Sequence, residues 1–175
     1  EFSAKKLKRS LKETKEKKFF RIFKTSKFLD EAFKADLEQV RNLYNEKGYR
    51  DAQIIVESVD DISSNLIDIN ITIEEGIKYH FRNIDWLGNT KYNSEYLDLL
   101  LGINSGDVYD EKMMNERLQM SMSGTDITSL YMDDGYLFFN IDPVEILVEE
   151  DSIDYEIRIY EGKQATINKV TVVGN

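Results

Sequence analysis

The sequence repeats itself at a nearly constant spacing, and this repeat restricts the chain to folds built from copies of one small module. Leu, Tyr, Gly and Tyr of residues 43–49 recur in residues 130–136, at an offset of 87. Ile, Asp, Ile, Ile, Glu, Gly, Gly and Asn of residues 67–89 recur in residues 153–175, at an offset of 86. A single loop deletion between the two blocks accounts for the difference of one residue.

The first copy contains a helix followed by two strands. Residues 29–47 place apolar side chains at helical spacing, and Asp30 and Gly48 are suited to cap and end this helix. Tyr49–Val59 is rich in Ile and Val, which predicts a strand, and a polar turn cluster follows it. Isoleucine at every second position of residues 67–73 then predicts a strand with one buried and one wet face.

The second copy also contains the start of the module. Residues 81–86 predict a short strand that ends at Gly88-Asn89. Ser94 and Asp110 are suited to cap two successive helices, and residues 153–159 repeat the alternating last strand. The module order is therefore strand, helix, helix, strand, strand. This order predicts an α+β fold in which each module has a three-stranded mixed sheet with both helices on one face.

The repeat also predicts the domain organisation. Residues 1–78 form a module that lacks its first strand, residues 79–163 form a complete module, and residues 164–175 are the first strand of a following module. We expect almost no linker at the boundary near Lys78–Tyr79. The sheet face away from the helices stays in water, as the charged positions Asp154, Glu156 and Arg158 require.

Three motifs in a fixed order resemble the polypeptide-transport-associated (POTRA) repeat. The first strand ends in Gly-Asn, at Gly88-Asn89 and Gly174-Asn175. The second helix ends in Leu-Tyr-x-x-x-Gly-Tyr, at residues 43–49 and 130–136. The last strand ends in Glu-Gly, at Glu75-Gly76 and Glu161-Gly162. The set covers essentially the whole chain, and residues 129–139 look most similar to BamA proteins. The resemblance implies tandem periplasmic modules ahead of an outer-membrane β-barrel that lies C-terminal to this segment.

The resemblance also implies a function without catalysis or a cofactor. POTRA modules receive unfolded outer-membrane proteins and dock accessory subunits of the assembly machine by β-strand augmentation. Two neighbouring alternatives are the POTRA region of a two-partner secretion transporter and a POTRA-bearing cell-envelope scaffold. The first would carry two modules, whereas residues 167–175 open a third, and the second typically carries one.

Binding by strand addition requires an open sheet edge. The apolar alternation along residues 137–149 changes parity at Asp142-Pro143, so we expect a β-bulge there. Proline is largely confined to edges and bulges, so this strand is predicted to be outer and the strand at residues 153–159 central. We expect partners to pair along the outer strand, at Tyr136, Leu137, Phe138, Asn140, Asp142, Val144 and Glu145.

Two insertions depart from a typical module, at Ser10–Lys27 and Met120–Thr128. Residues 1–29 carry eleven Lys or Arg in a chain whose net charge is −10. The first insertion mixes cationic and aromatic side chains, which suits a membrane surface or an acidic protein rather than nucleic acid, at Lys17, Lys18, Phe19, Arg21, Phe23 and Lys24. The alternative is a solvated helix face with the aromatic side chains packed beneath the helices.

The composition offers few groups for catalysis. The chain has no cysteine and one histidine, His80, so thiol chemistry, Cys-based zinc sites and a His-based metal cluster are excluded. Asp133-Asp134-Gly135 and residues 45–48 lack the continuing acidic spacing of a calcium loop. No apolar run reaches the ~18 residues of a membrane span. We therefore expect no active site and no metal or cofactor site.

The two ends of the sequence complement each other. Residues 1–3 align with residues 92–94, so the first module has no opening strand, whereas residues 166–175 form an opening strand without a module. Ile167, Val170 and Val172 match the apolar residues of the strand at residues 81–86. Two explanations compete. The sequence is an excised part of a larger chain, or the fragment is real and its tail either stays loose or, by strand exchange, fills the vacant position of another molecule.

Overall fold

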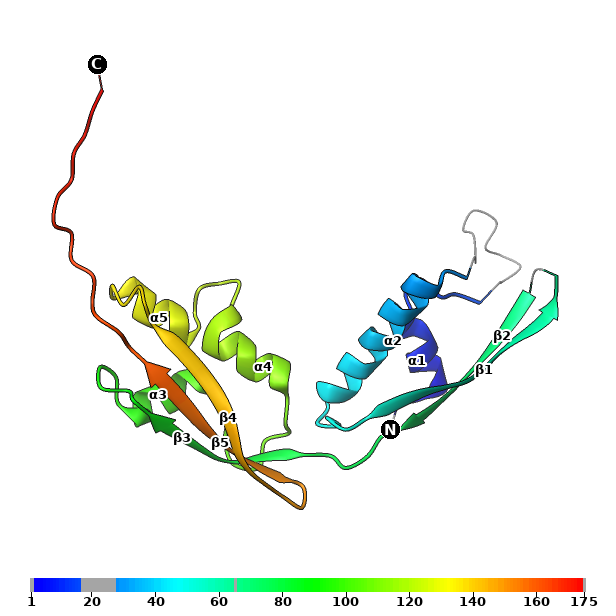
Figure 1. Cartoon of the computed structure of the whole chain (residues 1–175). Coiled ribbons are helices and arrows are strands. Elements are labelled where there is room, and N and C mark those ends of the chain that lie inside the picture. The colour runs from blue at the N-terminus through cyan, green and yellow to red at the C-terminus, as the bar shows by residue number, and fades with distance from the viewer. Residues whose placement is uncertain (1, 17–27, 65, 175) are drawn as a thin grey trace. The chain divides into compact units, whose positions relative to one another are not determined.

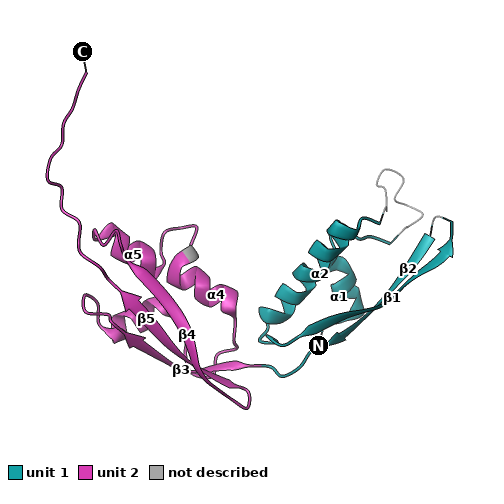
Figure 2. Ribbon diagram, in the orientation of Figure 1, with its two compact units in different colours: residues 1–78 teal, residues 79–175 magenta. Residues whose placement is uncertain are grey.

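The computed structural model describes residues 2–16, 28–64 and 66–174. The chain divides into two compact units, residues 1–78 and residues 79–175, which are coloured separately in Figure 2. Each unit has its own sheet, helices and core, and each is described by itself below. None of the helices in the described residues is both long and apolar enough to cross a membrane.

The first unit is a β-hairpin with two helices on one of its faces (Figure 1). Its elements are α1 (Ala4–Ser10), α2 (Asp30–Asn45), β1 (Gln53–Ser63) and β2 (Leu66–Glu74). β1 and β2 pair antiparallel from Gln53↔Glu74 to Ser63↔Leu66. Among the described residues, the core cluster has four buried side chains, Val40, Tyr44, Tyr49 and Ala52, with partly buried neighbours that include Leu7 of α1, Ile54 of β1 and Ile73 of β2.

Two boundaries of the first unit differ from the sequence prediction. Asp30 does not cap α2, because it is already the first helical residue, and its carboxylate instead forms an i,i+4 ion pair with Lys34 at 2.6 Å. β1 starts at Gln53 rather than Tyr49 and continues through the predicted turn cluster to Ser63. The face that carries Asp60 and Asp68 is exposed, so these two like charges are tolerated although they lie opposite each other in the ladder.

A buried carboxylate fixes the chain that leaves α1. Asp36 of α2 is 1% exposed and accepts hydrogen bonds from the backbone N–H groups of Lys12, Glu13 and Thr14, at distances from 2.6 to 3.2 Å. Burial acts to raise the pKa of Asp36, but these hydrogen bonds outweigh it and hold the pKa below its ordinary value. This contact joins the two helices of the unit and was not foreseen from the sequence.

The second unit has the predicted strand, helix, helix, strand, strand order (Figure 1). Its elements are β3 (His80–Leu87), α3 (Ser94–Leu101), α4 (Glu111–Asn115), the π-helical segment η1 (Glu116–Met120), α5 (Ile127–Asp133), β4 (Asn140–Glu149) and β5 (Ser152–Tyr160). The sheet order is β3-β5-β4, with β3 parallel and β4 antiparallel to β5. The α+β class, the mixed three-stranded sheet and the central last strand are confirmed for this unit.

The caps of this unit are partly those expected. Asp110 caps α4 by accepting from the N–H of Met113 at 2.9 Å, as predicted. The cap of α3 is Asn93 and not Ser94, because the Asn93 side chain accepts from the N–H of Tyr96 at 3.0 Å. The second insertion splits the second helix, and α5 begins at a cap that sequence reasoning missed, the buried Asp126.

The core of this unit lies between the helices and the central strand β5. Ile153, Tyr155, Ile157 and Ile159 of β5 are buried on the helix side. Asp154, predicted to be wet, is 6% exposed, because Arg82 of β3 covers it with two hydrogen bonds of 2.8 and 2.9 Å. The same carboxylate accepts from the N–H of Asn83 at 3.1 Å, where the β3–β5 register is irregular. The charge is therefore paired within the sheet rather than solvated.

The close approach of β3 and β5 yields a test of this packing. Gly88 has φ 92°, and a Cβ there would lie 2.2 Å from the carbonyl oxygen of Ile159. We expect Gly88→Ala to lower the free energy of unfolding by about 2–5 kcal/mol, from left-handed strain and the clash together. Gly106→Ala is the matched control, because Gly106 has φ 89° and open space around it. The control should lose only about 1–2 kcal/mol in urea denaturation, and equal losses would contradict the clash.

Candidate functional site

The two outer strands of the second unit, β3 and β4, differ in whether their outer edges are already hydrogen-bonded. β3 is already engaged on its outer side by residues 106–109: Gly106 donates to the carbonyl of Phe81 at 2.7 Å, and Phe81 donates to that of Asp107 at 2.9 Å. Tyr109 also donates to the carbonyl of Tyr79 at 2.9 Å. The first half of β3 is therefore unavailable to an incoming strand.

β4 forms the opposite edge, and among the described residues no strand pairs with its outer side. It is paired on its inner side with β5 from Asn140↔Tyr160 to Glu149↔Ser152. Pro143 lies opposite Ile157 within this ladder. A proline fits an edge strand where its nitrogen points to the open side, so the outer edge offers no backbone donor at this one position.

The structure separates the predicted edge residues into two groups. Asn140, Asp142, Val144 and Glu145 lie on β4, as predicted. Tyr136, Leu137 and Phe138 precede the strand in a turn, which is closed by the N–H of Phe139 donating to the carbonyl of Tyr136 at 3.0 Å. Tyr136 packs against the core, whereas Phe138 is 72% exposed and Leu137 58%. The edge strand is thus shorter than predicted, with two exposed apolar side chains ahead of it.

The bulge predicted at Asp142-Pro143 is absent, and the irregularity of β4 lies between Glu145 and Leu147. Ile141 is buried and Pro143 half-buried, and the Glu145 carboxylate accepts from the Tyr155 hydroxyl at 2.8 Å. Ile141, Pro143 and Glu145 therefore lie on the same face of the strand, without a change of face at the proline. The predicted bulge was wrong because the prediction followed apolar residues alone. Pro143 and Glu145 lie on the core side of the strand, and neither was counted among those apolar residues.

An apolar segment follows the irregularity. Ile146, Leu147 and Val148 are 50%, 48% and 45% exposed, on a strand whose outer edge is open. Three consecutive exposed apolar residues are unusual at a free edge, which proteins ordinarily protect with charge or proline. The segment lies after Pro143 and before the Glu149–Arg82 ion pair of 2.7 Å. Pro143 and the paired Glu149 therefore flank this apolar segment, but neither charge nor proline protects the segment itself.

The end of the sheet is fixed by a hydrogen bond that both units share. In the second unit the hydroxyl of Tyr131 donates to Glu161 at 3.1 Å, and in the first the hydroxyl of Tyr44 donates to Glu75 at 3.1 Å. Burial, together with the neighbouring Glu75, raises the pKa of Tyr44 to about 12. This is the physical role of the Tyr of the Leu-Tyr motif and the Glu of the Glu-Gly motif.

Glu161 also holds the loop that follows β3. Its carboxylate accepts from the N–H of Thr90 at 2.8 Å, the N–H of Lys91 at 2.7 Å and the hydroxyl of Thr90. Burial acts to raise the pKa of Glu161, but the hydrogen bonds from Thr90, Lys91 and Tyr131 outweigh it and hold the pKa below its ordinary value. The carboxylate thus serves a structural purpose and stays ionised.

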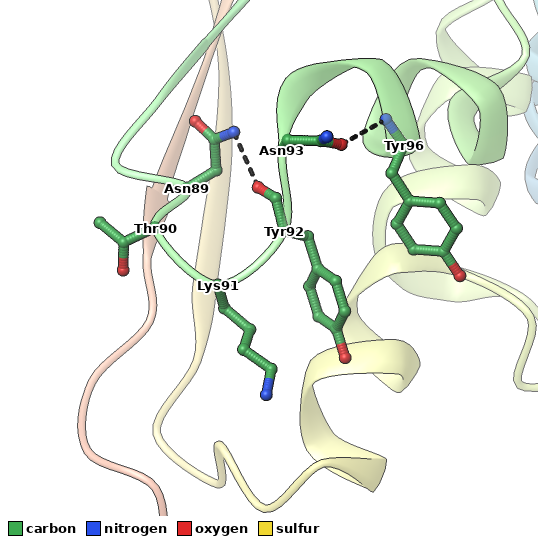
Figure 3. Close-up of a pocket in the computed structure, with 6 residues that line it drawn as sticks. All are labelled: Asn89, Thr90, Lys91, Tyr92, Asn93 and Tyr96. Atoms are coloured by element: carbon green, nitrogen blue, oxygen red, sulfur yellow. Dashed lines mark hydrogen bonds between the residues drawn. The ribbon is translucent and has the colours of Figure 1, made fainter.

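A shallow pocket lies in this loop, lined by Asn89, Thr90, Lys91, Tyr92, Asn93 and Tyr96 (Figure 3). The loop satisfies its own polar groups: Asn89 donates to the carbonyl of Tyr92 at 3.0 Å, and Lys91 pairs with Asp134 at 2.7 Å. No group of three metal-ligating side chains occurs in the described part of the chain. His80 is half-buried and lies 3.4 Å from Asp151. The residues that line the pocket therefore form a rigid connection between β3 and α3.

The basic and aromatic contact residues of the first insertion, Lys17, Lys18, Phe19, Arg21, Phe23 and Lys24, lie outside the described residues.

The chain matches a known protein family and is similar to known proteins. The POTRA family, described as surface antigen variable number repeat, matches residues 1–76 and 79–162. The chain is 27% identical over 127 residues to outer membrane protein assembly factor BamA of Neisseria meningitidis serogroup B, an alignment of 69% of this chain and 16% of that protein. It spans less than a fifth of the length of the curated relatives that it matches.

Two solved structures share the fold. The crystal structure of Haemophilus influenzae BamA POTRA3-5 superposes with a TM-score of 0.58 at 17% identity, covering 99% of this chain and 68% of that one. That of Haemophilus ducreyi BamA lacking POTRA domains 1-3 gives 0.56 at 16% identity, with 90% and 27% covered. At these identities the likeness concerns the fold.

The Glu161 contacts predict a pH dependence of stability. The pKa of Glu161 is lower in the folded than in the unfolded state, so the ionised carboxylate contributes to the stability of the fold. This contribution is fully present above the unfolded pKa of about 4.3 and is lost as the pH falls through the folded pKa. We expect Glu161→Gln to lower the free energy of unfolding by about 1–2 kcal/mol at pH 7 and by less at pH 3. Chemical denaturation at both pH values measures this, with the exposed Glu116→Gln as the control. Equal losses at the two pH values would show that the charge is irrelevant.

Proposed function

The chain belongs to the POTRA family, and from this we propose that the outer edge of β4 binds extended protein segments during outer-membrane protein assembly. The segments come from unfolded outer-membrane proteins and from accessory subunits of the assembly machine. On this proposal residues 1–78 and 79–163 are two periplasmic modules of a longer outer-membrane protein, and residues 164–175 begin a third. The single observation that carries it is the open outer edge of β4, on the opposite side of the sheet from the occupied edge of β3.

Recognition through the backbone suits clients of many sequences. An edge strand offers N–H and C=O groups in a fixed spacing, so it selects extended conformation more than side-chain identity. The exposed side chains of Ile146, Leu147 and Val148 add apolar contact of the kind that alternating barrel strands can meet. Phe138 extends this surface beyond the start of the strand.

Pro143 limits the strength of this binding. An added strand finds no backbone donor there, so the ladder along β4 is interrupted near its middle. Weak, divided pairing is compatible with transfer of a client, because a continuous ladder would release it slowly. The interruption also restrains pairing between copies of the protein, which is a common use of proline at sheet edges.

The position of the binding edge can be tested by photocrosslinking. We expect a photoreactive residue at Asn140 or Glu145 to capture an unfolded outer-membrane β-barrel protein held soluble in dilute urea. The same residue at Leu99, which is 76% exposed on α3, is the control. Mass spectrometry of the products should show at least about fivefold more adduct at the two β4 positions, given an interaction of about 1 kcal/mol or more. Equal or greater labelling at Leu99 would refute the β4 edge.

A second prediction concerns the proline itself. Pro143→Val restores an N–H group to the outer edge, so affinity for a peptide with the sequence of one barrel strand should increase about 2- to 10-fold, as one net hydrogen bond gives. Isothermal calorimetry or fluorescence anisotropy measures the change. Val144→Ile changes a neighbouring side chain but no backbone donor, and it should leave affinity nearly unaltered. Unchanged or weaker binding by Pro143→Val would argue against pairing along this strand.

A further inference from the structure

Helix α1 of the first unit has the same place in its module as α3 of the second. Ser3 caps α1 and Asn93 caps α3, each through its side chain. The ring that precedes each cap lies edge-on to the buried tyrosine of the Leu-Tyr motif, at 4.8 Å from Phe2 and 5.0 Å from Tyr92. These contacts align the two helices at an offset of 90, one less than the alignment of residues 1–3 with 92–94 gives, and allow a comparison position by position.

The outward sides of the two helices differ in charge. α1 presents Lys5 and Arg9 on the side away from Leu7, which packs against the core. The corresponding residues of α3 are Glu95 and Leu99. Because the same module forms with an acidic and an apolar residue at these positions, its fold does not require the two cations.

The cations are also placed unfavourably for the helix itself. Lys5 and Arg9 are four residues apart on one side of α1, a spacing at which like charges destabilise a helix. Lys5 and Lys6 lie in the first turn, where the helix dipole favours acidic residues, and α1 has no acidic residue there. The stability of α1 therefore does not account for this pattern, which points to a contact outside the unit.

Acidic neighbours do not compensate this charge. Four exposed cations form no ion pair among the described residues, and they make up the α1 patch: Lys5, Lys6, Arg9 and Lys12. On α2, by contrast, Lys34 and Arg41 are each paired with an acidic residue of their own helix, at 2.6 and 3.1 Å. Positive charge is thus neutralised on one helix of the unit and left available on the other.

The unit holds α1 in a fixed position. Leu7 and Leu11 pack against the core, and the N–H of Lys12 donates to the buried Asp36 carboxylate at 2.7 Å. The apolar side of α1 is therefore used within its own unit. A partner of this helix has to be bound through the charged side, and the strength of binding has to depend on salt.

We propose that the α1 patch binds the anionic headgroups of a phospholipid surface. Clusters of about 4–8 Lys or Arg on a helix bind such headgroups through charge, without insertion of apolar side chains. The net charge of −10 repels the chain as a whole from an anionic surface, so the attraction is local and turns α1 towards the headgroups. The proposal does not depend on the function proposed for the β4 edge.

Co-sedimentation of the full chain with vesicles tests this surface. The vesicles consist of phosphatidylcholine alone or with about 30 mol% phosphatidylglycerol, at low ionic strength. We expect binding to the anionic vesicles only, and its loss at about 0.5 M salt, where the charges are screened. Equal binding to both kinds of vesicle, binding that resists salt, or no binding to the anionic vesicles would overturn the proposal.

Paired substitutions identify the cations that bind. Lys5→Gln together with Arg9→Gln should weaken binding to the anionic vesicles at least about tenfold. Lys34→Gln together with Arg41→Gln is the matched control, because it removes the same charge from α2, and it should change affinity less than about threefold. Circular dichroism checks that both variants keep their helices. Equal losses in the two variants, or unchanged affinity after substitution in α1, would overturn the proposal.

A soluble polyanion distinguishes a lipid surface from an acidic protein. Poly-glutamate is added as a competitor while binding to the anionic vesicles is measured. We expect the vesicles to retain the chain when glutamate side chains equal the anionic lipids in concentration, because a membrane surface presents many headgroups to the patch at once. Complete displacement under this condition, or binding of poly-glutamate without binding of vesicles, would overturn the lipid assignment in favour of an acidic protein.

Discussion

The hydrogen bond from a buried tyrosine hydroxyl to a glutamate at the end of the last strand is the contact on which each module depends. Tyr131 and Tyr44 are 0% and 1% exposed, so neither hydroxyl could lose its partner without a desolvation cost of about 1–3 kcal/mol. The bond joins the last helix to the end of the last strand, and Glu161 adds the loop after β3. The repeated sequence motifs are therefore the two halves of one contact that closes the sheet against the helices.

The same tyrosine also anchors the turn that leads to the edge strand. In both units the chain turns directly after the tyrosine, and the N–H of a second tyrosine returns to its carbonyl at 3.0 Å, from Tyr49 to Tyr44 and from Tyr136 to Tyr131. The paired rings lie edge-on, 6.0 and 5.8 Å apart. Gly48 and Gly135 permit the turn with φ values of 91° and 87°. The edge strand therefore starts from a rigid corner, which presents its backbone in a defined direction.

The sequence alone was sufficient for the module order, the strand order and the outer position of β4, because these depend on periodicity and on motifs that recur. The details that it missed depend on polar groups whose partners lie far along the chain. Asp154 reads as a wet position until Arg82 is seen beside it, and Glu145 reads as solvent-facing until Tyr155 is seen to donate to it. The residues next to a carboxylate in the sequence do not indicate whether it binds water or a side chain far along the chain. The misplaced bulge has this same cause.

A three-stranded sheet built by this repeat has one edge that its own connections cover and one that they cannot. The crossover from β3 through the helices returns residues 106–109 along β3, whereas β4 and β5 are joined by a tight hairpin that leaves the far side of β4 open. The asymmetry follows from connectivity and not from any particular side chain. Side chains then determine how accessible the open edge is, and here Pro143 lacks a backbone donor while the apolar segment after it has no charge or proline to protect it.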